Sequence, residues 1–180
     1  MVTFEELRQG QYVKSLEKVE KEKYVSFHLD NYKLDLQSSN FFLDIGNAKY
    51  SAIAGYYAVL NVTLWYFAKF FNLKISEKSV GIHKNCQIVL NRFVKDKKLK
   101  EKILDLLSEA QKEFSSFTVL KTRKEETLPL MLKQSSDKRK KYTYYSEREL
   151  SQESDKVMEA KNFIEHVVKP YISIMEKLEC

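Results

Sequence analysis

Residues Tyr50–Ala68 read YSAIAGYYAVLNVTLWYFA, nineteen residues without a formal charge. A stretch of this length could cross a bilayer, or it could form the central helix of a soluble bundle. Its tyrosines, together with Ser51, Asn61 and Thr63, are too polar for a good membrane span. The rest of the chain contains no second candidate span, and the mean hydropathy is -0.46. We therefore expect a buried helix in a protein that does not enter a membrane.

The order of side-chain sizes in this stretch indicates how the helix packs. Small residues recur at near-helical spacing and would let neighbouring helices approach closely: Ala48, Ala52, Ala54, Gly55 and Ala58. Larger apolar residues form a broad face: Ile53, Tyr56, Tyr57, Leu60, Leu64, Phe67 and Phe71. A helix that is apolar nearly all round belongs in a core, so we expect both Tyr56 and Tyr57 to be core residues.

Composition favours long helices in a single domain. The chain has 180 residues, of which 43% are hydrophobic and 31% are charged, as in ordinary globular proteins. Only 4 glycines and 2 prolines are available for turns, and no alternating strand pattern or Asn-Gly turn occurs. We therefore expect an all-α fold, an antiparallel up-and-down helical bundle of about five to six helices.

Hydrophobic periodicity predicts the elements in order. We expect a first helix at Thr3–Phe27 that opens with a Thr3/Glu6 capping box, a polar loop at Asp30–Asn40, helical turns at Phe41–Asn47, the central helix to Phe71, and a connection at Asn72–Ser76. We then expect a helix from Ser76 that breaks at Asp96–Lys98, an amphipathic helix at Leu99–Phe114, a charged linker at Thr118–Thr127, a helix from Pro129 to about Tyr145, and a last helix from Ser151 that is kinked at Pro170. Residues 1–180 would form one domain, with 1–40 as an extended or added N-terminal helix and 41–178 as the bundle.

The two cysteines, Cys86 and Cys180, argue against a disulfide framework and against a structural zinc site. Neither lies in a Cys-x-x-Cys or Cys/His cluster, so Cys86 is expected to be a small core residue. The N-terminus lacks the basic and apolar regions of a signal peptide. We expect a cytoplasmic protein with no metal site and no cofactor.

Positive charge is concentrated in two segments. Lys84–Lys102 holds seven lysines and arginines against two acids, and Lys121–Arg148 holds nine against four, so each segment carries +5. The first 48 residues sum to -2 and the last 32 sum to -3. Basic segments in an otherwise neutral-to-acidic chain suggest an anionic partner, although a solvated lysine-rich face explains them equally well.

Four motifs in this order resemble the HEPN domain family of bacteria and archaea. They are Ala54-Gly55-Tyr56-Tyr57-Ala58-Val59 in the central helix, Val80-Gly81-Ile82-His83-Lys84 at the start of the next helix, Arg139-Lys140-Lys141-Tyr142-Thr143-Tyr144-Tyr145, and Ala160-Lys161-Asn162-Phe163-Ile164 in the final helix. The resemblance spans roughly residues 40–178. It implies an antiparallel helical bundle that forms a homodimer, and a setting such as a small nucleotidyltransferase partner or a toxin–antitoxin-like system.

The resemblance also bears on catalysis. Many HEPN proteins are ribonucleases with an Arg followed after four to six residues by a His, where Arg neutralises a phosphate and His moves the 2′-hydroxyl proton. None of the three histidines follows an Arg at that spacing, and after Arg139 the corresponding positions hold Tyr144, Tyr145 and Ser146. A tyrosine is a poor general base at neutral pH. We therefore assign no catalytic residue and expect a protein that binds a nucleotide or RNA without cleaving it.

The expected binding site is a cluster of cations and aromatic rings in the last third of the chain, joined by one histidine: Lys138, Arg139, Lys140, Lys141, Tyr142, Tyr144, Tyr145 and His83. Cations hold phosphates and aromatic rings stack on bases, which suits single-stranded RNA or a nucleotide. A structural interpretation is also open: the cations would lie at a helix end where the dipole favours them, the tyrosines would anchor the bundle, and His83 would be a core residue. Two other functions stay open: a divergent metal-independent ribonuclease that uses Arg139 with Tyr144 or His83, and a protein-interaction module whose basic segments are only solvated.

Overall fold

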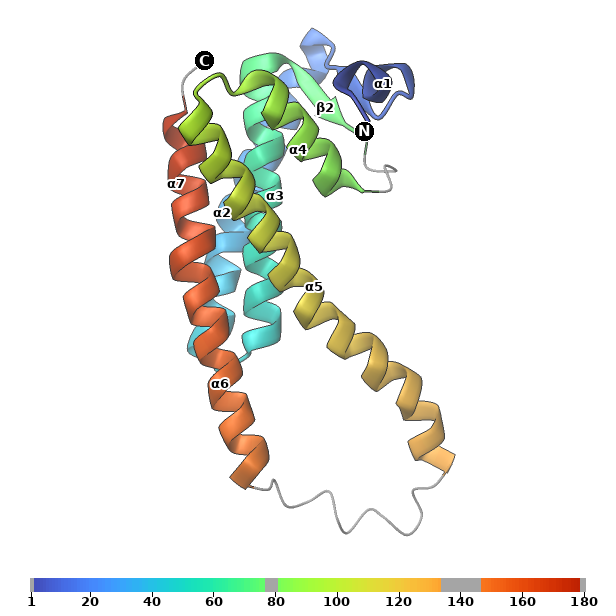
Figure 1. The fold of residues 1–180 in the computed structure, drawn as a ribbon, viewed down its shortest axis with the longest axis vertical. Coiled ribbons are helices and arrows are strands. Elements are labelled where there is room, and N and C mark those ends of the chain that lie inside the picture. Colours follow the sequence, from blue (N-terminus) through green and yellow to red (C-terminus); the bar gives the residue numbers. More distant parts are fainter. Residues whose placement is uncertain (1, 77–80, 134–146, 179–180) are drawn as a thin grey trace.

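The protein folds into a helical bundle with one small two-stranded sheet (Figure 1). The computed structural model describes residues 2–76, 81–133 and 147–178. The elements in chain order are α1 (Phe4–Gln9), β1 (Val13–Ser15), α2 (Lys18–Asp44), α3 (Ala48–Phe71), β2 (Leu73–Ile75), α4 (Ile82–Phe93), α5 (Lys97–Lys133), α6 (Glu147–Phe163), the π-helical turn η2 (Ile164–Val168) and α7 (Lys169–Lys177). The expected helical class is confirmed, with a short strand pair added to it.

Helix α3 is the centre of the bundle, because α2, α5 and the column formed by α6, η2 and α7 all pack against it. Its side chains are buried over most of its length, and several have no exposed surface: Ser51, Ala52, Ala58, Val59, Val62, Thr63, Phe67 and Ala68. The prediction of a buried central helix is confirmed. Among the described residues, no helix combines the length and the apolar character that crossing a bilayer requires.

The two adjacent tyrosines of α3 have different environments. Tyr56 is 6% exposed and belongs to the core, whereas Tyr57 is 43% exposed. Neighbouring residues on an α-helix point about 100° apart, and the bundle covers only the side on which Tyr56 lies. The prediction that both are core residues is therefore wrong for Tyr57, whose ring meets Phe114 edge-on at the margin of the core.

Gly55 is a point of very close approach between α3 and the C-terminal column. A Cβ atom at this position would lie 2.6 Å from Cδ1 of Ile164 and 3.1 Å from Cγ2 of Val168. It would also lie 3.2 Å from Cε1 of Phe163. Interiors packed at this density have no spare room for a methyl group. The lack of a side chain at Gly55 thus sets the distance between α3 and the column.

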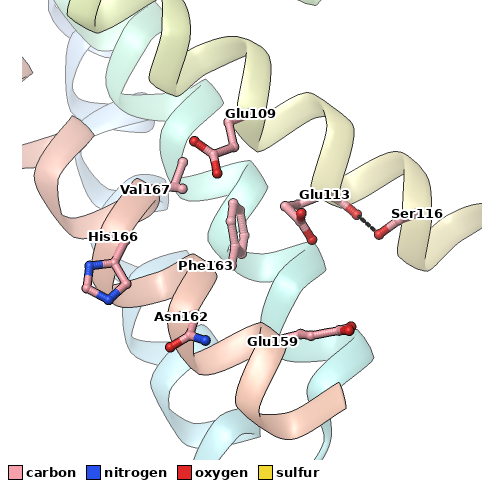
Figure 2. Close-up of a pocket in the computed structure, with 8 residues that line it drawn as sticks. All are labelled: Glu109, Glu113, Ser116, Glu159, Asn162, Phe163, His166 and Val167. Atoms are coloured by element: carbon pink, nitrogen blue, oxygen red, sulfur yellow. Dashed lines mark hydrogen bonds between the residues drawn. The ribbon is translucent and has the colours of Figure 1, made fainter. Parts of the chain in front are cut away.

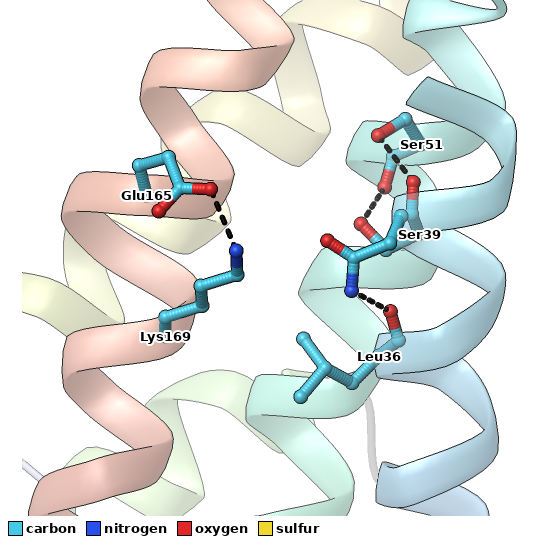
Figure 3. A network of polar contacts seen from close by, with 6 residues as sticks. Leu36, Ser39, Ser51, Glu165 and Lys169 are labelled. Carbon is cyan, nitrogen blue, oxygen red and sulfur yellow. Dashed lines mark hydrogen bonds and ion pairs between the residues drawn. The ribbon is translucent and has the colours of Figure 1, made fainter. Parts of the chain in front are cut away.

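The C-terminal column contains the π-helical turn η2 directly before Pro170. Proline has no backbone N–H, and inside an α-helix its ring clashes with the carbonyl four residues earlier, here that of His166. A π-helical turn shifts those carbonyls and lets the helix continue through the proline. The sequence predicts a kink at Pro170, and the structure places the distortion in the preceding turn. An ion pair from Lys169 Nζ to Glu165 Oε1, at 2.6 Å, spans the junction (Figure 3).

The single helix that the sequence predicts at Thr3–Phe27 is replaced by α1, β1 and the first part of α2. The capping box is present, since Thr3 N donates to Glu6 Oε2 at 2.7 Å and Glu6 N donates to Thr3 Oγ1 at 3.2 Å. Helix α1 nevertheless ends at Gln9, and β1 then pairs antiparallel with β2, with Val13 opposite Ile75. The expectation of a fold without strands is wrong here, because hydrogen bonds to a distant segment override the local helical pattern.

The expected polar loop at Asp30–Asn40 is also wrong, because this segment is the second half of α2. Ser39 is fully buried and donates its hydroxyl to the backbone carbonyl of Ser51 at 2.9 Å. Ser51 in turn donates to the carbonyl of Ser39 at 2.8 Å (Figure 3). A serine that bonds across a helix–helix contact gives the same sequence signal as a serine in a loop. The polar residues therefore join α2 to α3 and do not separate them.

Two further boundaries differ in the second half of the chain. The expected charged linker at Thr118–Thr127 is wrong, because α5 runs through it and continues through Pro129. The predicted break after α4 is confirmed, and Asp96 begins α5 by accepting a hydrogen bond from Leu99 N at 2.8 Å. Residues 77–80, where a helix was expected to open, lie outside the described residues, and α4 begins at Ile82.

We expect the substitution Gly55→Ala to destabilise the protein by about 1–3 kcal/mol, because the added Cβ overpacks the contact with Ile164. The measurement is the free energy of unfolding from urea denaturation. Helix preference alone would stabilise the alanine variant by up to about 1 kcal/mol. An alanine variant as stable as the wild type, or more stable, would therefore contradict the close approach at this position.

Candidate functional site

Most of the predicted binding residues lie outside the described residues. This applies to the cluster of cations and tyrosines: Lys138, Arg139, Lys140, Lys141, Tyr142, Tyr144 and Tyr145. Their role in RNA or nucleotide binding stays a prediction. Within the described residues, three features are relevant to binding: the buried His83, an acidic cavity and a group of exposed cations.

His83, the other predicted site residue, lies near the start of α4 and is 2% exposed. Its ring stacks beside that of Tyr56 at a centroid distance of 6.3 Å, and Tyr56 stacks on Phe114 at 4.3 Å. Nε2 of His83 lies 3.4 Å from Nε2 of Gln87, which also donates to Oγ of Ser108 at 2.8 Å. Nδ1 of the imidazole has no hydrogen-bond partner among the described residues.

Burial keeps this histidine uncharged at neutral pH. It lowers the pKa of His83 from 6.5 to about 4. Burial also raises the pKa of Tyr56 to about 12 and raises the pKa of the Cys86 thiol. A buried, neutral imidazole cannot hold a phosphate by charge. The neighbouring Tyr56 and Cys86 stay protonated at neutral pH. The surroundings of His83 therefore favour a core role over acid–base chemistry, and Cys86 is buried as expected.

An open cavity of about 620 Å³ lies between α5 and the C-terminal column (Figure 2). Its lining combines carboxylates, an imidazole, an amide and a hydroxyl with apolar side chains: Glu109, Glu113, Ser116, Glu159, Asn162, Phe163, His166 and Val167. Figure 2 shows the glutamates of α5 opposite the column that carries Glu159 and His166. The last of these comes from the π-helical turn η2, so the same distortion that accommodates Pro170 places an imidazole at this cavity.

The charges of this acidic cavity favour a cation over an anion. Burial, followed by repulsion from Glu159 and from Glu109, raises the pKa of Glu113, while Lys112 opposes the shift. A bound cation would relieve that repulsion, and a phosphate would add to it. The acids are nonetheless spread out, since within the described ranges no three His, Cys, Asp or Glu side chains are placed to hold a metal ion.

The sequence alone does not reveal the acidic cavity. Glu109 and Glu113 are four residues apart on a predicted helix, and Glu159, Asn162 and His166 follow at intervals of three and four on another. Each set can be recognised as the polar edge of an amphipathic helix. The two edges face each other only because of the way α5 packs against the column. This packing has no local sequence signal.

A group of cations lies along α4 and at the start of α5, and all of them except the half-buried Lys100 are exposed. We call it the basic corner and define it as Lys84 and Arg92 of α4, Lys95 of the connection, and Lys97, Lys98 and Lys100 of α5. No ion pair within the described residues involves any of them. The nearest acid in sequence, Asp96, is engaged at the start of α5. The corner therefore has more positive than negative charge, with Glu5 lining one neighbouring hollow and Asp96 the other.

Two hollows meet at Arg92 in the basic corner. One, of about 730 Å³, lies between the N-terminal segment and α4, and Lys84 also lines it. The other, of about 440 Å³, is lined by Lys95 together with three aromatic residues: Tyr66, Phe71 and Phe93. The rings of Phe71 and Phe93 lie 4.3 Å apart. Arg92 is thus an exposed cation between two concave surfaces, one of which has an aromatic lining.

Comparisons with protein-family models, with curated proteins and with solved structures found no match to this chain. The case for a function therefore rests on the geometry and charge of the site.

We expect the buried His83 to make stability depend on pH. Between pH 6.5 and about 4 the unfolded chain binds a proton at this residue and the folded chain does not. The free energy of unfolding should therefore fall as the pH falls through this range, by up to roughly 3 kcal/mol from this group. Urea denaturation of the wild type and of His83→Asn at pH 7, 6, 5 and 4 isolates the contribution, because the carboxylates titrate in both. Parallel pH profiles would contradict the burial of this imidazole.

Proposed function

We propose that the protein binds single-stranded RNA or a nucleotide without cleaving it, on a HEPN-like helical bundle, and that the basic corner is part of the binding surface. The observation that carries the proposal is the position of Arg92, an exposed cation between two hollows, one of which is also lined by Lys84 and the other by Lys95. Cations that outnumber the neighbouring carboxylates attract phosphates and release counterions when they bind them.

The spacing of these cations suits a backbone that carries repeated charges. Lys84 and Arg92 are eight residues apart on one helix, which corresponds to about 12 Å along its axis. Lys95 and the lysines at the start of α5 continue the positive surface around the corner. Several phosphates of one strand could therefore be contacted at once, and the salt dependence of binding would report how many.

The aromatic lining supports a single-stranded ligand over a duplex. Phe71 and Phe93 are only half-buried and lie beside Arg92 and Lys95 in the smaller hollow. Unstacked bases gain free energy by stacking on such rings, and any base can do so. The combination of a ring and a cation recognises a base and its phosphate together, which also fits a free nucleotide.

The acidic cavity limits where a strand could run. Glu109 and Glu113 lie roughly 20 Å along α5 from the lysines at its start. Their carboxylates would repel phosphates, so a nucleic acid would contact the first turns of α5 and not its middle. The predicted cluster Lys138–Tyr145 is proposed as a second contact region for the same ligand. A nucleotidyltransferase partner or a toxin–antitoxin-like setting is part of the same proposal.

We expect Arg92→Ala combined with Lys95→Ala to weaken the binding of labelled single-stranded RNA by about tenfold or more, and to reduce the slope of log K against log salt by roughly 1 to 1.5. The measurement is a titration with short RNAs and with ATP at low and moderate salt. The matched control is Lys112→Ala combined with Lys161→Ala, which removes the same charge from exposed residues on the two helices that border the acidic cavity.

If the wild type binds RNA and the Arg92/Lys95 variant binds it equally well, the basic corner is rejected as the binding surface. Arg139→Ala combined with Lys141→Ala tests the predicted second contact region in the same assay. Cleavage of RNA in EDTA that is lost on Arg139→Ala would reassign the protein to the ribonucleases. A wild type that binds neither RNA nor ATP would reject the proposed function and favour a protein-interaction module.

A further inference from the structure

The larger of the two hollows at Arg92 has a row of polar side chains along one wall. Helix α4 contributes Lys84, Gln87, Asn91 and Arg92 to this hollow of about 730 Å³. Residues at intervals of three and four lie on one face of a helix, so the two amides lie between the two cations. Volumes of roughly 300–1,000 Å³ are typical of sites that hold a small-molecule ligand. The proposed function uses the cations and gives the amides no role.

The side-chain amide of the half-buried Gln87 is held in one orientation. Its Nε2 donates to Oγ of Ser108 at 2.8 Å and makes a longer contact of 3.4 Å with Nε2 of His83. An amide nitrogen has two hydrogens and accepts no hydrogen bond, so both hydrogens are engaged and Nε2 of the neutral His83 is the acceptor. Within the described residues no hydrogen bond is made to Oε1 of Gln87. The amide therefore keeps an oriented carbonyl oxygen that can accept from a ligand.

Asn91 adds a second amide one turn further along α4. Its side chain is exposed, and its backbone carbonyl accepts from Nζ of Lys100 at 3.1 Å. No hydrogen bond in the part of the chain that the structure describes involves its side-chain amide. Asn91 therefore offers a ligand one acceptor, Oδ1, and one donor, Nδ2, side by side. Residues four apart on a helix have Cβ atoms about 5–6 Å apart, so both amides can contact one planar ring.

We propose that Gln87 and Asn91 select bases that carry an exocyclic amine beside an acceptor nitrogen of the ring, as adenine and cytosine do. This inference rests on the proposed function and names the bases that the site prefers. The amine has two hydrogens, one for Oε1 of Gln87 and one for Oδ1 of Asn91, while Nδ2 of Asn91 donates to the ring nitrogen. Uracil and hypoxanthine have a carbonyl oxygen in place of the amine, and that oxygen would face two acceptors.

The other walls of the larger hollow agree with this assignment. Glu5 lines it, and its carboxylate is a further acceptor that disfavours a carbonyl oxygen or a phosphate nearby. Lys84 and Arg92 flank the amides and would contact the phosphates on either side of the base. The described lining of the smaller hollow contains no amide side chain, so base selection is expected in the larger hollow. Three partly buried apolar side chains also line the larger hollow and can cover the face of a base: Phe4, Ile88 and Leu104.

The test compares ligands that differ only at the amine. A short uridine strand with one central adenosine is titrated beside the same strand with inosine, in which a carbonyl oxygen replaces the amine, and ATP is titrated beside ITP. We expect the wild type to bind each adenosine ligand about 5-fold or more tightly, because one matched bidentate contact discriminates to this extent. Asn91→Ala and Gln87→Met should each bring the ratio of the two dissociation constants toward unity. The salt dependence of binding should stay as in the wild type, because neither variant removes a cation.

Two features keep the test free of folding effects. Asn91→Ala changes an exposed side chain that makes no hydrogen bond within the described residues. Gln111→Met, at an exposed position of α5, is the matched control for Gln87→Met and should leave the ratio unchanged. Circular dichroism and thermal unfolding verify that each variant is folded.

The outcomes separate this inference from the proposed function. A wild type that binds RNA but treats adenosine and inosine alike, or prefers inosine, would overturn the inference and leave the proposed function standing. A preference for adenosine that survives both variants would likewise overturn the assignment to Gln87 and Asn91. A wild type that binds neither RNA nor ATP would reject the inference together with the proposed function.

Discussion

The close contact between α3 and the C-terminal column at Gly55 is the constraint on which the rest of the structure depends. With no side chain at this position, the two helices meet through Ile164 and Val168, which are the first and last residues of the π-helical turn. That turn continues the column through Pro170 and sets the place of His166 beside the acidic cavity. The remaining elements close around the same central helix: α2 on one side through the reciprocal Ser39–Ser51 hydrogen bonds, and α5 on another.

Charge divides this framework into regions of opposite sign. The start of α5 belongs to the basic corner, and its middle carries the acids that line the cavity. A phosphate and a cation would thus be attracted to different places on one helix. The outer face of α2 is apolar, and α2 makes no substantial contact with α4 or α5 within the described residues.

The sequence predicts correctly the helices that have a strong hydrophobic period. The prediction is wrong where polar residues are paired inside the fold. Helix α3 was predicted correctly from its long apolar run. Its few polar side chains are paired inside the fold: Thr63 donates to Val59 O at 2.7 Å, and Asn61 pairs with both His28 and Asp35. Ser39 carries no comparable local signal, which is why Asp30–Asn40 of α2 was predicted as a loop. The three-residue strands depend on pairing across some sixty residues, and the faces that meet at the acidic cavity depend on tertiary packing, so neither has a local signature.

Hydrogen exchange of the backbone amides, followed by mass spectrometry at a concentration where the chain is monomeric, tests most directly whether α3 is the centre of the fold. A helix against which most other elements pack opens only when the whole protein unfolds, whereas outer helices open locally. We predict that the amides of Ala52–Ala68 exchange most slowly, with a protection equal to the global stability, and that α1 and the first turns of α2 exchange faster. Protection in α3 no greater than in α1 or the start of α2 would contradict the account.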